Sequence, residues 1–120
     1  MNYPSIIAVE FDGTLCETAK YPEIGTCGYY NKAVIEYVKN AKASGSKLVL
    51  CTMREGEPLE AALRWCEEKG LTFDAVNDNL MELQVEFGFN PRRIFANMYI
   101  GDKYMTPKMV NDALWAERGN

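Results

Sequence analysis

Short apolar segments alternate with amphipathic helical patterns along the whole 120-residue chain. Four of these segments have the length and composition of buried strands: Ser5–Glu10, Lys47–Cys51, Thr72–Val76 and Tyr99–Ile100. Apolar stripes at helical spacing, and a Thr-Pro helix start, predict four helices: Asn31–Ser44, one around Leu59–Cys66, Leu80–Phe87, and one that begins at Thr106-Pro107. This order indicates an α/β fold, a parallel sheet with right-handed crossovers and helices on both faces.

The length allows one hydrophobic core and is too short for two, so residues 1–120 are expected to form a single domain. The helical and strand patterns break over residues 16–30, which hold Pro22, Gly25, Gly28 and three tyrosines. Loops of this length are usually functional in small domains. We predict a flap over a binding site; the alternative is a surface loop whose aromatic rings pack on the core.

Composition excludes several classes of function. No apolar run approaches the roughly 20 residues that span a bilayer, and no signal peptide is apparent, so we expect a cytoplasmic protein without membrane contact. The net charge is −4, and Arg92-Arg93 is the one basic pair, which argues against nucleic-acid binding.

Cysteine and histidine usage narrows the chemistry further. The four cysteines form no C-x-x-C pair and are expected to be reduced thiols. The chain contains no histidine, which removes Ser-His-Asp and Cys-His catalysis and the histidine-bearing zinc motifs. The remaining candidates are carboxylates, hydroxyls, cationic side chains, thiols and a bound ion.

Polar residues follow each predicted strand. They are Glu10 and Asp12, then Thr52 and Arg54, then Asp78, and finally Asp102 and Lys103. Taken singly, Asp12-Gly13 is also a turn signal and Asp78 a possible helix cap. Because ligands of open parallel sheets bind at the carboxyl ends of the strands, the set as a whole points to one site. Carboxylates and a hydroxyl suit Mg²⁺ and a phosphate group.

Several phrases resemble those of the haloacid dehalogenase-like (HAD) phosphohydrolases. "VEFDGTL" is similar to the first motif of this family, "KLVLCTMREG" to the second and "MYIGDK" to the fourth. "YPEIG" and "TMREGEPLEAALRWCEEKGLTFDAVNDN" are similar to phrases of a small, capless subgroup. The resemblance implies a Rossmann-like sheet without a cap domain and a Mg²⁺-dependent phosphatase that acts on a small phosphorylated substrate.

The resemblance also implies roles for individual residues. Glu10 stands at the nucleophile position and Asp12 at the position of the general acid and base. Gly13 and Thr14 shape the loop around the substrate, and Thr52 supplies the hydroxyl that binds phosphate.

The ion and the cation of the site are implied in the same way. Asp102 matches the metal-binding acid, so the Mg²⁺ ligands would be a Glu10 carboxylate oxygen, the Asp12 main-chain oxygen and Asp102. The third motif requires a Lys or Arg, for which Arg93 is the first choice and Lys103 the second.

Arg54 follows the second motif directly. A guanidinium there can hold the phosphate or carboxylate of a substrate through paired hydrogen bonds. The alternative is a salt bridge to Glu55, Glu57 or another nearby acid.

Two departures from the family pattern support a second hypothesis. Glu10 replaces the usual Asp, and the fourth motif lacks a second Asp because Thr106 and Pro107 occupy those places. The alternative function is therefore a catalytically inactive HAD-like domain that binds metal, phosphate or a protein partner. A receiver-like signalling domain fits less well, because Asp78 is poorly placed for its phosphorylated Asp. The sequence specifies neither the substrate nor the oligomeric state.

Overall fold

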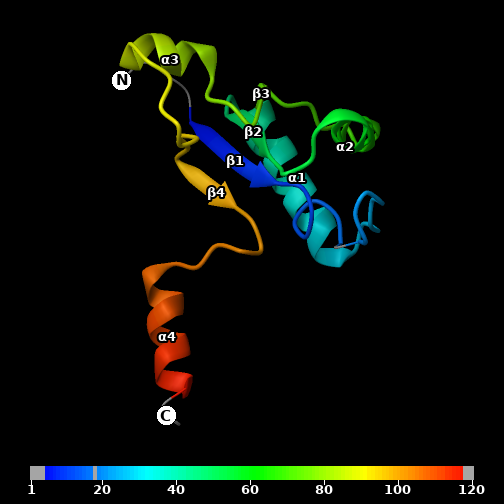
Figure 1. The fold of residues 1–120 in the computed structure, drawn as a ribbon, viewed down its shortest axis with the longest axis vertical. Coiled ribbons are helices and arrows are strands. Elements are labelled where there is room, and N and C mark those ends of the chain that lie inside the picture. Colours follow the sequence, from blue (N-terminus) through cyan, green and yellow to red (C-terminus); the bar gives the residue numbers. More distant parts are fainter. Residues whose placement is uncertain (1–4, 18, 118–120) are drawn as a thin grey trace.

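The computed structural model describes residues 5–17 and 19–117. Four parallel strands form one sheet in the order β3-β2-β1-β4 (Figure 1). Their bounds are β1 (Ile6–Glu10), β2 (Lys47–Cys51), β3 (Ala75–Val76) and β4 (Met98–Ile100). The expected α/β fold with a parallel sheet is confirmed.

Four helices follow the strands in alternation: α1 (Tyr29–Ala43), α2 (Gly56–Glu68), α3 (Met81–Phe87) and α4 (Pro107–Glu117). Helix α1 begins two residues before the predicted start. The side chain of Asn31 accepts a hydrogen bond of 2.8 Å from the backbone N–H of Gly28, which caps the first turn. The third strand is shorter than predicted and covers Ala75–Val76 alone.

Each face of the sheet has its own apolar cluster. On one face, Val9 and Leu50 belong to the cluster that includes Val38 of α1 and Cys66 of α2. On the other face, Ile6 and Val49 pack with Leu80 and Leu83, at and within α3. Because alternate strand residues point to opposite faces, Glu10 lies on the α3 face with Ile6.

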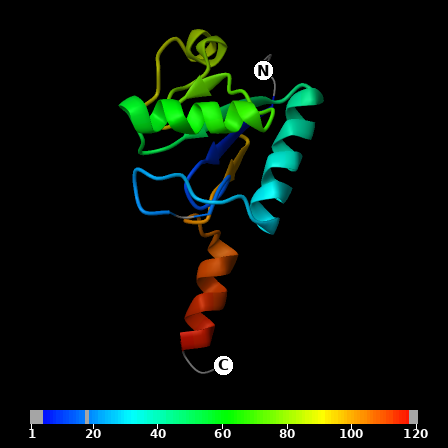
Figure 2. The same cartoon turned by 90° about the vertical axis from the view of Figure 1, so that its right-hand side faces the viewer.

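Helix α4 departs from the expected arrangement. All of its residues are exposed, and it extends away from the sheet, past the carboxyl ends of the strands (Figures 1 and 2). The prediction of helices on both faces is therefore met by α1, α2 and α3 only.

Two further expectations from the sequence concern the cysteine thiols and the crossing of a membrane. All four cysteines carry free thiols, as expected. Within residues 5–17 and 19–117, no helix combines the length and the apolar character that a membrane crossing requires.

Candidate functional site

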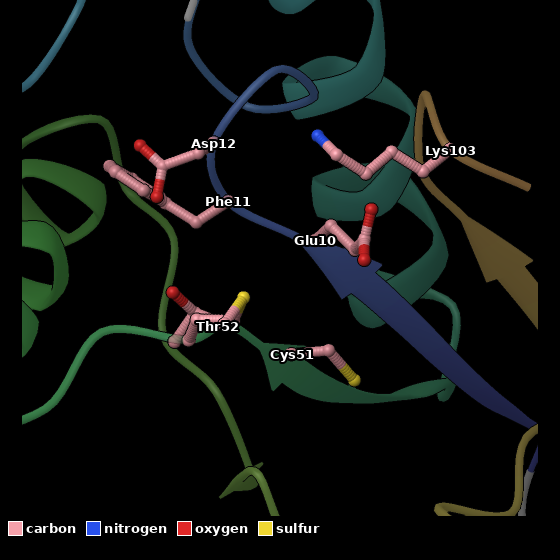
Figure 3. Close-up of a pocket in the computed structure, with 7 residues that line it drawn as sticks. Glu10, Phe11, Asp12, Cys51, Thr52 and Lys103 are labelled. Atoms are coloured by element: carbon pink, nitrogen blue, oxygen red, sulfur yellow. The ribbon is translucent and has the colours of Figure 1, made fainter. Parts of the chain in front are cut away.

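The polar residues that follow β1, β2 and β4 meet at the carboxyl edge of the sheet. The register aligns Glu10 with Cys51 and Val9 with Ile100, so these strands end side by side. A cavity of about 130 Å³ opens between the strand ends (Figure 3). It is lined by Glu10, Phe11, Asp12, Cys51, Thr52, Met53 and Lys103. Its volume is about four times the ~30 Å³ share of a liquid water, which suits a small ionic group.

Two carboxylates near this edge of the sheet each lie against a glycine. A Cβ on Gly13 would lie 2.5 Å from the Oδ2 atom of Asp102, and a Cβ on Gly101 would collide with the Glu10 carboxylate. Burial raises the pKa of Glu10, the nearby Asp102 carboxylate raises it further, and Lys103 partly offsets the rise. A cation near both carboxylates would relieve the smaller part of this pKa shift, which comes from their mutual repulsion.

The cation that lines the cavity is Lys103. Its Nζ atom lies 3.7 Å from the Oδ1 atom of Asp102, and its side chain is largely exposed. Arg93 lies elsewhere: its guanidinium is 5.2 Å from the centre of the Tyr99 ring, and it lines a separate cavity with Phe95. The choice of Arg93 as the cation of the site is therefore wrong for this geometry, because stacking on Tyr99 holds the guanidinium away. The second choice, Lys103, lines the cavity and stays a prediction for this function.

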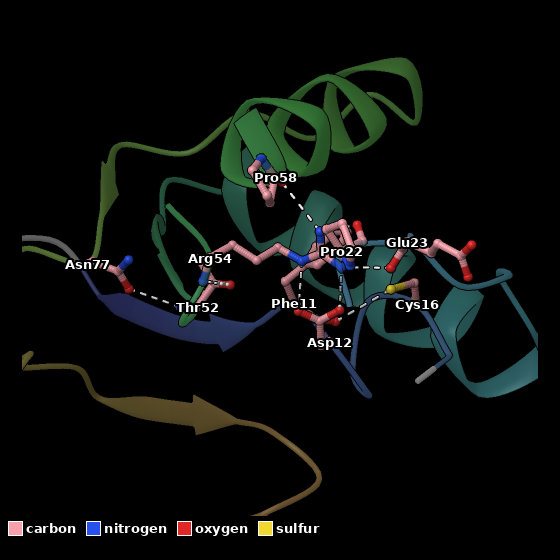
Figure 4. A network of polar contacts seen from close by, with 9 residues as sticks. All are labelled: Phe11, Asp12, Cys16, Pro22, Glu23, Thr52, Arg54, Pro58 and Asn77. Atoms are coloured by element: carbon pink, nitrogen blue, oxygen red, sulfur yellow. Dashed lines mark hydrogen bonds and ion pairs between the residues drawn. The ribbon is translucent and has the colours of Figure 1, made fainter. Parts of the chain in front are cut away.

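Arg54 is buried, with only 2% of its surface exposed, and its guanidinium donates hydrogen bonds to other groups of the protein (Figure 4). Its Nε donates to Oδ2 of Asp12 at 2.8 Å, and its Nη2 donates to Oδ1 of Asp12 at 2.9 Å. It also donates to the carbonyl oxygens of Pro22 and Glu23, at 3.0 and 2.9 Å. The predicted contact with substrate is corrected: the salt-bridge alternative holds, with Asp12 rather than Glu55 or Glu57 as partner. These hydrogen bonds from Arg54 to Asp12 are the main cause of the raised pKa of the guanidinium.

Residues 16–30 reach the carboxyl edge, as a flap requires, but they cover the Arg54–Asp12 pair. The Tyr21 ring lies 5.5 Å from the Arg54 guanidinium carbon. Among residues 16–17 and 19–30, none lines the cavity beside Glu10. Tyr29 and Tyr30 belong to α1 and are about four-fifths exposed, so they neither pack on the core nor screen the cavity.

The two threonines of the motifs have different surroundings. Thr52 lines the cavity, and its Oγ1 accepts a hydrogen bond of 3.0 Å from the backbone N–H of Arg54, which leaves the hydroxyl proton for a ligand. Thr14 is buried, and its Oγ1 accepts a hydrogen bond of 3.2 Å from the backbone N–H of Asp102. Thr14 therefore joins the loops that follow β1 and β4, and its contact with substrate stays a prediction.

Sequence reasoning missed several asparagines that support the site. Asn31 is buried and donates to the carbonyl of Thr14 at 3.0 Å, which fixes the loop after β1. Asn77 has a left-handed φ of 51° and accepts a hydrogen bond of 2.9 Å from the backbone N–H of Thr52. The sequence "NDN" was the available signal, because Asn adopts the left-handed conformation more readily than most residues.

Comparison with known proteins adds a relative of the same size. No family model matches the chain, and no curated protein matches it. A solved structure described as a conserved protein coded by a locus of Bacteroides thetaiotaomicron is 30% identical in sequence and superposes with a TM-score of 0.70. The match covers 98% of this chain and 93% of that one. The chain belongs to the family of this conserved protein.

In this member of the family, the donor set at the cavity fits a magnesium ion. Among the described residues, no three His, Cys, Asp or Glu side chains converge as a metal site. Glu10 and Asp12 line this cavity, whereas Asp102 lines a neighbouring cavity beside Gly13, close enough to raise the pKa of Glu10. Mg²⁺ commonly binds through one or two carboxylates and keeps several waters, so two carboxylates and a backbone oxygen satisfy it.

Proposed function

We propose that the chain is a cytoplasmic, Mg²⁺-dependent phosphohydrolase of the HAD-like type that acts on a small phosphorylated substrate. The observation that carries this proposal is the proximity of Glu10 and Asp102: Asp102 lies against Gly13, Glu10 lies against Gly101, and the Asp102 carboxylate helps raise the pKa of Glu10. Such a pair repels itself unless a cation or a proton joins it. The adjoining cavity, with Thr52 and Lys103 on its walls, has the donors that a phosphoryl group needs.

The ion would be held by the carboxylates of Glu10 and Asp102 and by the main-chain oxygen of Asp12. When bound, it supplies positive charge to the phosphoryl oxygens. The substrate phosphate lies in the cavity, where Thr52 donates its hydroxyl proton to one phosphoryl oxygen and Lys103 offsets negative charge.

The reaction uses the carboxylates of this chain in two steps. A Glu10 carboxylate oxygen attacks phosphorus, the bond from phosphorus to the leaving oxygen breaks, and a carboxyl-phosphate forms. Asp12, once protonated, gives its proton to the leaving oxygen. The Asp12 carboxylate then takes a proton from water as that water attacks phosphorus, and Glu10 and inorganic phosphate are released.

A non-catalytic function is the second candidate, and one contact favours it. Both carboxylate oxygens of Asp12 accept hydrogen bonds from Arg54, which holds the carboxylate in place. An acid catalyst must instead carry a proton and reach the leaving oxygen. If Arg54 keeps Asp12 in this state with substrate bound, the domain binds metal and phosphate without turnover.

The test measures Mg²⁺ binding and hydrolysis separately. Calorimetry should detect Mg²⁺ binding to the wild type, and an aryl phosphate should be hydrolysed slowly with Mg²⁺ and not with EDTA. Asp102→Asn should weaken Mg²⁺ binding at least about tenfold, which is about 1.4 kcal/mol. Asp112→Asn is the matched control, because Asp112 lies on the exposed helix α4 and pairs with Lys108.

Three results distinguish the candidates. Binding with Mg²⁺-dependent turnover supports the phosphohydrolase. Binding without turnover, for every phosphate ester in a metabolite panel, supports the non-catalytic domain. Absence of Mg²⁺ binding in the wild type overturns the metal site itself.

A further inference from the structure

Helix α4 is an amphipathic helix with an uncovered apolar side. Met109, Val110, Ala113 and Leu114 recur at helical spacing and form what we term the α4 stripe. No residue of α4 is buried, and Val110 and Leu114 are 53% and 44% exposed. A helix of 11 residues is marginal in water on its own, because most helical stability in proteins comes from packing of the apolar face.

The surface of the chain is larger than its mass requires. A folded monomer of 13.6 kDa is expected to expose about 6,600 Å². The chain exposes 8040 Å², and its radius of gyration is 15.9 Å against about 13.6 Å for a compact chain of this length. The surplus of about 1,400 Å² exceeds the ~800 Å² per partner that a standard interface buries. The area available on this chain is therefore sufficient for a stable dimer.

A receiving surface lies on the α3 face of the sheet, beside the edge strand β4. A cavity of about 360 Å³ is lined there by Phe87, Pro91, Arg93, Phe95, Ala96 and Tyr99. This volume is more than twice the ~150 Å³ of a cavity that holds benzene in another protein. Parallel sheets normally have both faces covered by helices, and α4 does not cover this part of its own sheet.

The charges at the two surfaces are complementary. Arg93 lines the cavity, and Arg92 beside it is exposed. Glu117 stands four residues after Ala113, at the end of the α4 stripe. When the stripe covers the cavity, Glu117 and the arginine pair provide opposite charges at its rim.

We propose that the chain forms a two-fold dimer in which the α4 stripe of each copy packs on the cavity beside β4 of the other copy. The contact is reciprocal, since the same helix and the same cavity are used twice. Residues 101–106 connect β4 to α4 and cross between the two copies. This proposal is independent of the phosphatase proposal, because neither surface includes the Glu10 cavity.

Sedimentation equilibrium from about 1 to 300 μM tests the assembly. The wild type should approach twice 13.6 kDa as its concentration rises, with a Tm that rises in parallel. The double variant Val110→Asp/Leu114→Asp should remain at 13.6 kDa, with a Tm independent of concentration. The matched control is Lys108→Gln/Asn111→Asp, which makes the same change in charge on the polar side of α4 and should still dimerise. Far-UV circular dichroism shows whether each variant is folded.

An isotope-filtered NMR experiment on the wild type tests the contact without a variant. In a mixture of ¹³C-labelled and unlabelled protein, Leu114 methyl protons should show inter-chain contacts to the Tyr99 and Phe95 rings. The same contacts within one chain would mean that α4 folds back on its own sheet, which overturns the proposal. A wild type that stays monomeric at 300 μM, or a dimer that survives the Val110→Asp/Leu114→Asp change, overturns it as well.

Discussion

Two pairs of charged groups lie a few residues apart at the carboxyl edge of the sheet, and they differ in how the protein treats them. Asp12 is paired with a buried guanidinium that makes further bonds to the loop above it. Glu10 and Asp102, both negative, lie close enough for Asp102 to help raise the pKa of Glu10, with one exposed lysine nearby. The first pair is satisfied within the protein, whereas the second consists of two like charges that, in our proposal, a cation joins.

The two pairs therefore differ in function. The Asp12–Arg54 pair has a structural function, and the Glu10–Asp102 pair has, in our proposal, a binding function. A buried ion pair with all donors used adds rigidity to the loops that it joins. Two like charges at a cavity lower stability until a cation arrives, which is the usual condition of a metal site. Substitutions that alter one pair at a time test this difference.

Arg54→Met should have the largest effect on stability. The change leaves Asp12 and two loop carbonyls without their hydrogen-bond donors. The free energy of unfolding should fall by about 3 kcal/mol. This is the low end of the loss expected when a buried ion pair is broken, because Asp12 is partly exposed. Urea denaturation measures the loss. Arg64→Met on the exposed side of α2 is the matched control and should stay within about 0.5 kcal/mol of the wild type. Equal effects of the two variants would show that the Arg54 pair is not structural.

Gly13→Ala should come second, and it affects the other pair. Gly13 has a φ of 83°, and an added Cβ would displace the Asp102 carboxylate. Gly88 has a φ of 80° and open space around it, so Gly88→Ala reports backbone strain alone, about 1–2 kcal/mol. Gly13→Ala should lose about 1 kcal/mol more, and Mg²⁺ binding measured by calorimetry should weaken at least about tenfold. Unchanged Mg²⁺ binding in folded Gly13→Ala would separate Asp102 from the metal site.

The sequence predicted the architecture because the relevant signals are local. Apolar runs and helical stripes located the strands and helices, and the strand ends located Glu10, Thr52 and Lys103 near one cavity. The partner of Arg54 was missed because Asp12 is 42 positions away, and the nearer acids Glu55 and Glu57 offered an equally plausible pair.

Two other errors have the same origin. The position of Arg93 depends on stacking with Tyr99, which no spacing in the sequence reveals. The helical pattern of α4 predicts a helix with an apolar side, and it does not say which surface covers that side. Long-range packing, rather than local propensity, decides both.

Glu10→Asp should have the third largest effect, and it tests the chemistry of the pair. The Glu side chain adds one methylene, which displaces the carboxylate by up to ~1.5 Å. A misplacement of about 1 Å can lower a rate on the order of 10²-fold. We expect Glu10→Asp to raise aryl phosphatase activity at least about tenfold, equivalent to about 1.4 kcal/mol of barrier. Flat activity with intact fold and Mg²⁺ binding would favour the non-catalytic domain.

Glu10→Gln should have the smallest effect, within about 1 kcal/mol, and its sign depends on pH and on metal. Burial and Asp102 raise the pKa of Glu10 above 4.5, so the folded state holds this proton more tightly than the unfolded state does. Stability of the metal-free wild type therefore falls as pH rises from 4.5 through the raised pKa, and it stays lower above it. Gln cannot ionise, so metal-free Glu10→Gln should be more stable than the wild type at pH 7, with a difference that disappears below about pH 4.5. Saturating Mg²⁺ should reverse the order, because the ion stabilises the wild type alone. Thermal melts at several pH values, with EDTA or with Mg²⁺, measure both signs. A difference that does not change with pH would mean that neither burial nor Asp102 raises the pKa of Glu10, and the contrast between the two pairs would be lost.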